Sequence, residues 1–489
     1  MAANVAKNTL YLTAASIGQK LLAFVYFLFL ARVMGTEQTG GYFLALSITT
    51  IFSTFTDFGM TPVVIRDVAK YPLEAIGLVR RVLWLKIPFM AVGAIGAFIS
   101  VWMLDYDVRV RELVFIASLV MLADAISLLF YGVLRGHHAL KFESLGIFVG
   151  QTLTLIFGGT VLFAFPSLHL LVLALLAGST FNMIYSAWHV IRLLGPSVLS
   201  PVWDRATTKA LLLASLPFAL AGIFVKVYSY VDSIFISKFI GTAAVGVYAV
   251  AYKFTYSFQF LPMAFVAALY PGMSALVGKD LPRLRKLFDD AIWYVIVLAA
   301  PIAFGLFAIA PDAIALAGDG YQEAVPVLQA LVFVLIPIFL DFPVGSLLNA
   351  ADRQGTKTAI MGVTMVLNVI LNVLLIPSFG ILGAAYSALG SFTFLFVGGL
   401  CFVPQIIPGY SFVSFARTVF PILLSGAVMG AVAYALRPVI GFVLVVPVAV
   451  VVYLAMLLLT RSMRSTHLRT ALQLVRRKQV YVEDPALHD

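Results

Sequence analysis

The sequence contains about fourteen apolar runs, each long enough to cross a lipid bilayer as a helix. Clusters of glycine, proline and charged residues separate the runs. They lie near residues 10–31, 41–65, 82–103, 113–134, 145–165, 170–191, 211–237, 246–270, 288–310, 326–348, 358–377, 381–403, 414–436 and 439–460. The runs are continuous, whereas the strands of a membrane barrel alternate over about ten residues. We therefore predict an all-α polytopic membrane protein.

The composition agrees with lipid as the surrounding solvent. Hydrophobic residues make up 62% of the chain and charged residues 11%, whereas soluble domains average about 45–50% and about 25%. This excludes soluble enzymes and nucleic-acid-binding domains, so we expect the bilayer, but no nucleic acid, among the partners. The single cysteine, Cys401, lies in an apolar run. We expect no metal site and no cofactor.

Basic residues predict the orientation in the membrane, because they concentrate in cytoplasmic connections. With the N-terminus inside, about 24 of the 32 Lys and Arg fall on the inner side, about 5 outside and about 3 within spans. This count assigns Lys86 and Lys357 to cytoplasmic connections. We predict a multi-pass protein of the inner (cytoplasmic) membrane with both termini in the cytoplasm.

The chain also contains an internal repeat. A shift of 206 residues superimposes the first two spans on the seventh and eighth, and it pairs Lys20 with Lys226, Arg32 with Lys238, Gly35 with Gly241, Thr36 with Thr242, Gly40 with Gly246 and Tyr42 with Tyr248. Six spans per half is an even number, so we predict two parallel six-helix bundles around a central cavity, with a substrate site near the midplane. The predicted units are a first bundle (1–195), a cytoplasmic linker (196–210), a second bundle (211–405), two additional spans (406–461) and a basic cytoplasmic tail (462–489).

Charged residues inside the spans indicate the kind of substrate, because each costs about 2.5–3.5 kcal/mol or more unless it faces water or a partner. The candidates for binding are Lys20, Lys226 and Lys253, and we add Arg32 at the outer end of the first span. Several buried amines form a counter-surface for an anion such as a phosphate or diphosphate. The alternative is structural ion pairing, of Lys20 with Asp57 and of Lys226 or Lys253 with Asp232.

A second group of polar residues supplies candidates for lining the cavity or for coupling to an ion. It consists of Asp57, Asp232, Asp124, Asp341, Asn368 and Asn372. A coupling ion would be H⁺ or Na⁺, and the sequence does not distinguish them. Asp124 and Asp341 are also explained as carboxylates that stabilise helix packing. Asn368 and Asn372 stand four residues apart, which favours hydrogen bonding between helices, with a sugar contact as the alternative.

Several stretches together resemble the polysaccharide flippases of the multidrug/oligosaccharidyl-lipid/polysaccharide exporter superfamily. They are Ala31-Arg-Val-Met-Gly-Thr with Gly40-Gly-Tyr, Asp57-Phe-Gly-Met-Thr-Pro62, Asp232 through Gly246-Val-Tyr, and Leu367-Asn-Val-Ile-Leu-Asn372 through Pro377-Ser-Phe-Gly380. The resemblance covers essentially the whole chain. It implies a V-shaped cavity and the transfer of an undecaprenyl-diphosphate-linked oligosaccharide from the cytoplasmic to the outer leaflet.

The related lipid II flippases use cationic residues in spans one, two and eight to contact the diphosphate, and this carries over in part. Lys20 and Lys253 match the first and the last by position. The second span offers Asp57 instead of a cation, so the chain departs from that pattern there.

Other functions compete with this interpretation. A drug or organic-cation antiporter of the same superfamily would favour carboxylates and aromatic rings around its cation, and the excess of lysines counts against it. A membrane glycosyltransferase or polymerase is suggested by Asp105-Tyr-Asp107, but this motif lies on a short outer connection without a nucleotide-binding domain. We therefore expect a transporter rather than an enzyme. Its partners would be the lipid-linked oligosaccharide and, as a further possibility, a polysaccharide polymerase or assembly complex.

Overall fold

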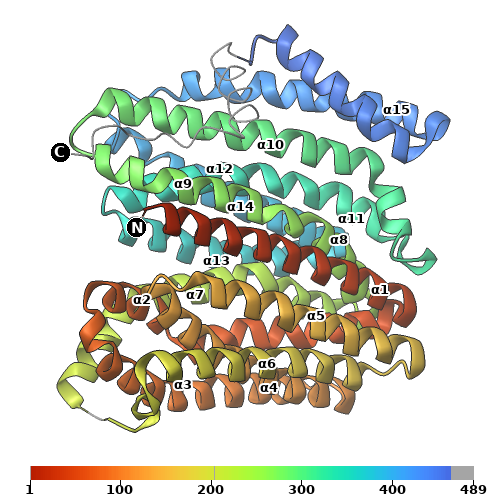
Figure 1. Ribbon diagram of the computed structural model, residues 1–489. Coiled ribbons are helices and arrows are strands. Elements are labelled where there is room, and N and C mark those ends of the chain that lie inside the picture. The colour runs from red at the N-terminus through yellow and green to blue at the C-terminus, as the bar shows by residue number, and fades with distance from the viewer. Residues whose placement is uncertain (1, 203, 464–489) are drawn as a thin grey trace.

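The computed structural model describes residues 2–202 and 204–463, and helices dominate both ranges (Figure 1). The first part contains α1 (Ala2–Asp57), α2 (Met60–Lys70), α3 (Ala75–Met103), α4 (Val108–Gly136), α5 (Leu140–Ala164) and α6 (Leu168–Leu194). The second contains α7 (Arg205–Phe239), α8 (Thr242–Tyr256), α9 (Phe260–Leu276), α10 (Leu281–Ala315), α11 (Ala324–Leu331), α12 (Leu335–Ala350), α13 (Gln354–Phe379), α14 (Ile381–Leu400) and α15 (Phe412–Leu459). No strand occurs within these ranges. The all-α prediction is confirmed.

Short 3-10 turns connect several of the helices. They are η1 (Pro72–Glu74), η2 (Pro196–Leu199), η3 (Ser257–Gln259), η4 (Asp319–Tyr321), η5 (Val332–Val334) and η6 (Val403–Gln405). η2 packs against α3 and α6, and α7 begins at Arg205, inside the stretch predicted to be a linker. Residues 464–489, which hold most of the predicted basic tail, lie outside the described residues.

The predicted spans can be traced through these helices. Eleven helical segments of the described chain are long and apolar enough to cross a membrane. α1 and α15 each hold two predicted spans, because their backbones turn at Gly35 (φ 75°) and Gly441 (φ 73°), in a left-handed conformation that glycine adopts at little steric cost. The eighth span consists of the shorter α8 and α9 joined by η3. With these three adjustments the segments account for all fourteen predicted spans.

α1 lies between the two halves of the molecule and contacts both. It packs against α3, α4 and α5 of its own half and against α7 and α8 of the other. α13 packs against α7 and α14, and α15 packs along α10. Figure 1 shows α3, α4 and α6 at the bottom of the view and α10 and α15 at the top. The contact of α1 with α7 and α8 brings the repeated helices of the two halves together.

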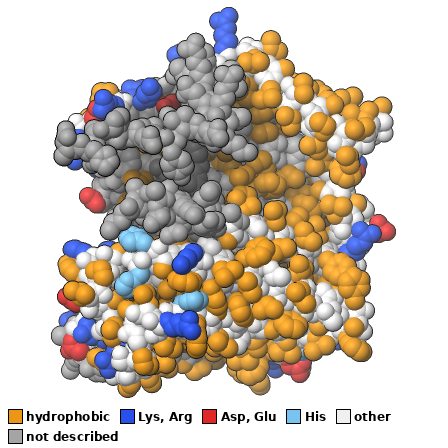
Figure 2. Space-filling model, in the orientation of Figure 1, with side chains coloured by type: hydrophobic (Ala, Val, Ile, Leu, Met, Phe, Trp, Pro, Cys, Tyr) orange, Lys and Arg blue, Asp and Glu red, His pale blue; other side chains and the backbone are white. Residues whose placement is uncertain are grey.

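The outer surface is apolar over much of its area. Large side chains such as Leu21 (58% exposed), Phe163 (81%) and Val439 (77%) point outward from helices in every part of the fold, and Figure 2 shows hydrophobic side chains over much of one face. Helices that expose this much apolar area are stable in lipid, where their backbone hydrogen bonds are satisfied internally. The protein is a multi-pass integral membrane protein.

Candidate functional site

The three candidate lysines come from three helices that meet between the halves. Lys20 belongs to α1, Lys226 to α7 and Lys253 to α8, and α1 packs against the other two helices. All three side chains are half-buried. Within the described residues, none of the three amines forms an ion pair with a carboxylate. The predicted alternative of structural ion pairs with Asp57 and Asp232 is therefore wrong for all three.

Aromatic rings, rather than carboxylates, lie beside these amines. The distances from Nζ to the ring centroid are 5.7 Å for Lys20 and Phe260, 5.8 Å for Lys226 and Tyr230, 5.2 Å for Lys253 and Phe27, and 5.8 Å for Lys253 and Phe43. The electron-rich face of a ring attracts a cation but does not neutralise its charge. Within the described chain, no carboxylate therefore competes with a ligand for these amines.

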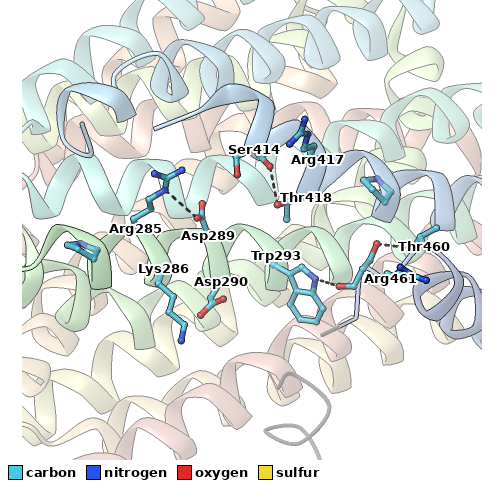
Figure 3. A pocket seen from close by; sticks show the side chains of 13 residues that line it. Arg285, Lys286, Asp289, Asp290, Trp293, Ser414, Arg417, Thr418, Thr460 and Arg461 are labelled. Atoms are coloured by element: carbon cyan, nitrogen blue, oxygen red, sulfur yellow. Dashed lines mark hydrogen bonds and ion pairs between the residues drawn. The ribbon is translucent and has the colours of Figure 1, made fainter. Parts of the chain in front are cut away.

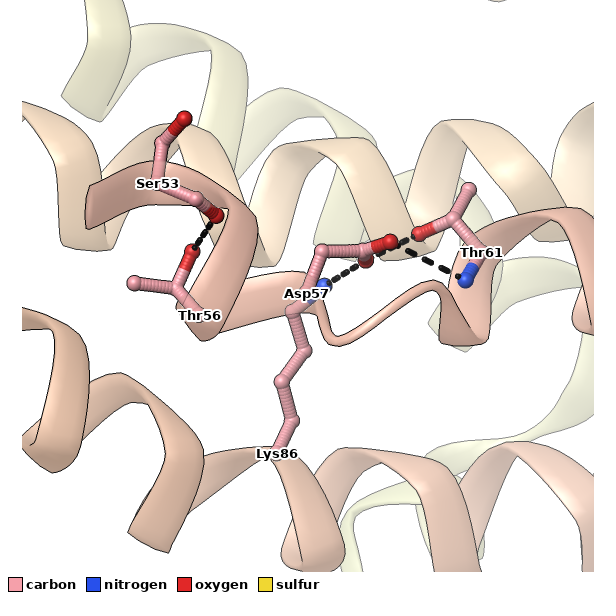
Figure 4. A network of polar contacts seen from close by, with 5 residues as sticks. All are labelled: Ser53, Thr56, Asp57, Thr61 and Lys86. Carbon is pink, nitrogen blue, oxygen red and sulfur yellow. Dashed lines mark hydrogen bonds and ion pairs between the residues drawn. The ribbon is translucent and has the colours of Figure 1, made fainter. Parts of the chain in front are cut away.

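Asp57 forms an ion pair with Lys86 instead of Lys20 (Figure 4). Lys86 Nζ lies 2.5 Å from Asp57 Oδ1, and the lysine side chain is fully buried in α3. The same carboxylate accepts hydrogen bonds from the hydroxyl and the backbone N–H of Thr61 in the first turn of α2. The assignment of Lys86 to a cytoplasmic connection is wrong, because the packing of α1 on α3 encloses it. Asp57 is thus held in a structural contact.

The second half contains a similar buried ion pair between an aspartate and a lysine of two other helices. Asp341 of α12 and Lys357 of α13 lie 2.5 Å apart, with side chains only 18% and 12% exposed. The sequence analysis also assigned Lys357 to a cytoplasmic connection. This assignment is wrong, because Lys357 lies within α13 and its side chain is largely buried against Asp341. A buried ion pair depends on both members, since removal of either leaves an uncompensated charge. Asp341 therefore has its counter-charge, unlike its predicted equivalent Asp124.

Asp124 shares a cavity with Lys226. The cavity has a volume of about 330 Å³, and its walls come from the second span in α1, from α4 and from α7. Its hydroxyl-bearing residues are Thr49, Thr50, Ser53 and Thr56. Asp124 is exposed to this space and does not pair with Lys226. The cavity thus presents an amine, a carboxylate and several hydroxyls to a polar ligand.

Asp232 is buried beside that region on α7. Its side chain is 2% exposed, Tyr248 donates a hydrogen bond to Oδ2, and Oδ1 has no partner within the described chain. Ser47 of α1 bonds to the neighbouring Ser233 at 3.4 Å. A buried oxygen without a partner costs free energy, so this carboxylate is a candidate for protonation or for binding a small cation.

Tyrosines surround Asp232 and extend along α8. Tyr248, Tyr252 and Tyr256 recur every four residues, so they lie on one face of the helix. The ring centroids of Tyr252 and Tyr256 are 4.1 Å apart, and Tyr230 of α7 lies 5.9 Å from Tyr252. The four-residue spacing was visible in the sequence, but the contribution of Tyr230 from another helix was not.

Asn368 and Asn372 are fully buried between α13 and α14. Asn368 Nδ2 donates to Ser391 Oγ at 3.2 Å, and Ser387 Oγ donates to the Asn368 carbonyl at 3.2 Å. Asn372 Nδ2 bonds to Asn368 Oδ1 at 3.0 Å, while Asn372 Oδ1 has no partner among the described residues. Asn368 thus links α13 to α14, and Asn372 bonds to Asn368 within α13.

The halves meet in a reciprocal contact where α1 and α8 begin their repeated segments. A Cβ built on Gly40 would lie 1.9 Å from the Thr242 carbonyl oxygen, and one on Gly246 would lie 2.0 Å from the Thr36 carbonyl oxygen. These residues are equivalent under the 206-residue shift, so the contact has approximate two-fold symmetry. The backbones touch directly because glycine has no side chain. We call this end of the molecule the closed end.

Two tyrosines reinforce the closed end with the same symmetry. Tyr106 of the first half lies 2.5 Å from Ser237 Oγ of the second. Tyr321 of the second half donates to the Ala31 carbonyl of the first at 3.0 Å. The 206-residue shift places Ala31 on Ser237. Arg32 is exposed at this end, beside Gly318, and it does not line the cavity that contains Lys226.

The Asp-x-Asp motif has structural roles. Asp107 caps α4 by accepting a hydrogen bond from the backbone N–H of Val110 at 3.0 Å, and Asp105 pairs with Arg111 at 3.2 Å. Within the described residues, no group of three or more His, Cys, Asp or Glu side chains is placed to hold a metal ion.

Residues 5–277 match the family described as "Polysaccharide biosynthesis protein". The chain belongs to this family. Residues 217–374 also match the MatE family. The predicted membership in the exporter superfamily is thereby confirmed, and the protein is a membrane flippase or transporter of that superfamily.

Proteins with related sequences include two from Haloferax volcanii. The chain is 34% identical over 170 residues to the probable flippase AglR, a match that spans only 34% of this chain and 36% of the relative. It is 24% identical over 398 residues to the probable low-salt glycan biosynthesis flippase Agl15, covering 80% of this chain and 81% of the relative. The lipid II flippase MurJ in an inward closed conformation shares the fold, with a TM-score of 0.76 at 14% identity, covering 92% of this chain and 98% of MurJ.

Proposed function

We propose that this family member flips a polyprenyl-diphosphate-linked oligosaccharide from the cytoplasmic to the outer leaflet of the cytoplasmic membrane, by alternating access, for export of cell-surface polysaccharide. Both termini then lie in the cytoplasm, and the closed end faces outward. The flippase names of two relatives and the family match support this proposal. A polysaccharide polymerase or assembly complex is proposed as a further partner.

The observation that carries the proposal is the contrast between two kinds of lysine. Lys86 and Lys357 are paired with carboxylates at 2.5 Å, whereas Lys20, Lys226 and Lys253 lie on the helices between the halves without such partners. An uncompensated charge at this depth is costly. Three amines without carboxylate partners are therefore best explained by an anion that binds between them. A diphosphate supplies several oxygens for charge-assisted hydrogen bonds.

The experiment is a flipping assay in proteoliposomes with diphosphate-linked and monophosphate-linked polyprenyl sugars. Replacing Lys20, Lys226 or Lys253 with Gln should slow flipping of the diphosphate lipid by about tenfold or more, since each loses a hydrogen bond to a charged group. The control is Lys279→Gln, an exposed lysine of the connection before α10. Normal flipping by the Lys20→Gln/Lys226→Gln double variant would contradict the proposal.

A drug or organic-cation antiporter is the second candidate. The match to MatE over residues 217–374 favours it, and so does Asp124, which faces a cavity and makes no ion pair within the described chain. The same proteoliposomes distinguish the two functions. Accumulation of an organic cation that is lost in Asp124→Asn, together with no flipping of the diphosphate lipid, would favour the antiporter.

The driving force is proposed to act through the carboxylates that lack a counter-charge. Asp124 lines the cavity, and Asp232 has one unpartnered oxygen, so each is able to take up H⁺ or Na⁺. Asp57 and Asp341 already pair with lysines, Asn368 bonds to Ser391 of α14, and Asn372 bonds to Asn368.

A further inference from the structure

Figure 3 shows a second polar cavity. The cavity lies at the start of α10, whereas Tyr321 of the closed end follows the other end of that helix, so the two are at opposite ends of the molecule. The cavity has a volume of about 330 Å³ and is formed by the first turns of α10 and by both ends of α15. α15 reverses direction at Gly441, so its first and last turns lie together. Trp293 of α10 donates a hydrogen bond to the Ser462 carbonyl at 2.8 Å and holds the end of α15 against α10. We call this cavity the α10–α15 pocket.

The pocket carries an excess of positive charge. Its lining includes four cations (Arg285, Lys286, Arg417 and Arg461) and two carboxylates (Asp289 and Asp290). Arg285 is directed at Asp289, with 3.9 Å between Nε and Oδ2. Asp289 also interacts with Tyr410, which lies just before α15. Burial and this carboxylate raise the pKa of Tyr410. Asp289 is therefore occupied, while the side chains of Lys286, Arg417 and Arg461 form no ion pair or hydrogen bond within the described chain.

Hydroxyl groups lie among these cations. Ser414 and Thr418 come from the first turns of α15 and Thr460 from its end. Thr460 Oγ1 lies 2.9 Å from Ser462 Oγ and 3.4 Å from Ser425 Oγ. Arginine, lysine and hydroxyl groups together are the donors that bind phosphate oxygens.

An apolar surface continues from the pocket toward the bilayer. Phe420 and Leu424 follow Arg417 at helical spacing on α15, and their side chains are 67% and 45% exposed. Leu459, just before Arg461, is 75% exposed. A ligand that fills the pocket with an anionic group and covers these side chains with hydrocarbon is an amphiphile. A free phosphate ion would leave the apolar surface uncovered.

We propose that the α10–α15 pocket binds the phosphate headgroup of an anionic membrane phospholipid, whose acyl chains lie along the exposed face of α15. Basic pockets between transmembrane helices on the cytoplasmic side bind anionic headgroups in this way. The site is separate from the lysines of the proposed transport cavity, and it rests on the proposed orientation of the protein but not on the proposed substrate. It gives the two spans outside the repeat a role in anchoring the second half to the inner leaflet.

The test is lipid binding to the full-length protein in nonionic detergent, followed by native mass spectrometry and thermal unfolding. Phosphatidylglycerol should bind and raise the unfolding midpoint, whereas phosphatidylcholine and inorganic phosphate should not. The Lys286→Gln/Arg417→Gln variant should bind phosphatidylglycerol at least about tenfold more weakly, because each cation near the surface contributes to the attraction. The control variant Lys209→Gln/Lys279→Gln removes the same charge from exposed positions outside the pocket and should bind normally.

Three outcomes would overturn the proposal. The first is equal binding of phosphatidylglycerol by the pocket variant and the unsubstituted protein. The second is an equal response to inorganic phosphate, which would assign the pocket to a soluble anion. The third is loss of binding in a chain that ends at Met463 while the pocket variant retains it, which would assign the lipid to residues 464–489.

Discussion

Lys86 and Lys20 are both lysines on transmembrane helices, yet their surroundings differ completely. Lys86 is fully buried and bonded to Asp57, whereas Lys20 is half-buried and lies over the ring of Phe260. The carboxylate of Asp57 also caps α2 through Thr61, so the pair joins α1, α2 and α3. Lys86 thus has a structural role, whereas Lys20 is the lysine proposed to bind the substrate.

At this scale we predict that Lys86→Met destabilises the protein strongly. The substitution leaves the Asp57 carboxylate buried without its counter-charge, which costs about 3–5 kcal/mol. Thermal unfolding in detergent should show a large fall in the midpoint, and the Asp57→Asn/Lys86→Met double variant should recover much of it. Lys20→Met is the matched control and should change the midpoint little, because no carboxylate loses its partner. An unchanged midpoint in Lys86→Met would refute the structural role.

Among the contacts between helices, the one between α1 and α8 at the closed end matters most for the proposed transport cycle. Gly40 and Gly246 allow the two backbones to touch, and Tyr106 and Tyr321 add hydrogen bonds from each half to the other. The contact lies where the repeats are related by symmetry. An alternating-access cycle has to break this contact to open the closed end.

We therefore predict that Gly40→Ala shifts the protein away from the closed conformation. The added methyl group would lie 1.9 Å from the Thr242 carbonyl oxygen, a backbone atom that cannot move unless the helices separate. The measurement is the spacing of spin labels at Asp105 and Ile240, exposed positions of the first and the second half near the closed end, introduced as cysteines into a Cys401→Ser chain. Gly41→Ala is the control, because its methyl group would make an ordinary contact of 3.7 Å with Leu113. Identical distance distributions in the two variants would contradict the prediction.

At the scale of the whole molecule, the distribution of charge and the path of the helices support one topology. The connections at the closed end follow odd-numbered spans, and those at the α10–α15 pocket follow even-numbered ones. Basic residues concentrate at the second group, which is the pattern of cytoplasmic connections. We therefore propose that the closed end faces the outer surface.

This topology is tested with single cysteines in a Cys401→Ser background, labelled in intact cells by a maleimide that does not cross membranes. Asp105→Cys should react, because its side chain is 98% exposed beside the closed end. Lys209→Cys and Lys279→Cys should react only after the cells are permeabilised. Labelling of all three variants in intact cells would reject the predicted orientation. Labelling of Lys279→Cys alone would reverse it.

The sequence predicted the local part of the candidate site better than its long-range part. Lys20, Lys226 and Lys253 were identified because charge within an apolar run is visible along the chain. Lys86 and Lys357 were overlooked as buried residues, since both lie within a few residues of a span's end. The cavity shared by Asp124 and Lys226 joins residues from α4 and α7, and no spacing along the chain relates them.

Hydropathy alone therefore determined the membrane environment and the helical spans, because these properties depend on each segment by itself. Comparison of segments 206 residues apart revealed the internal repeat. The tertiary structure decided which charged residues form ion pairs. Asp57, for example, pairs with Lys86 and not with Lys20. It also decided that Gly40 and Gly246 close one end and that α15 folds onto α10. The physical reason is that a contact between helices depends on their rotation and register, and many distant side chains set these together.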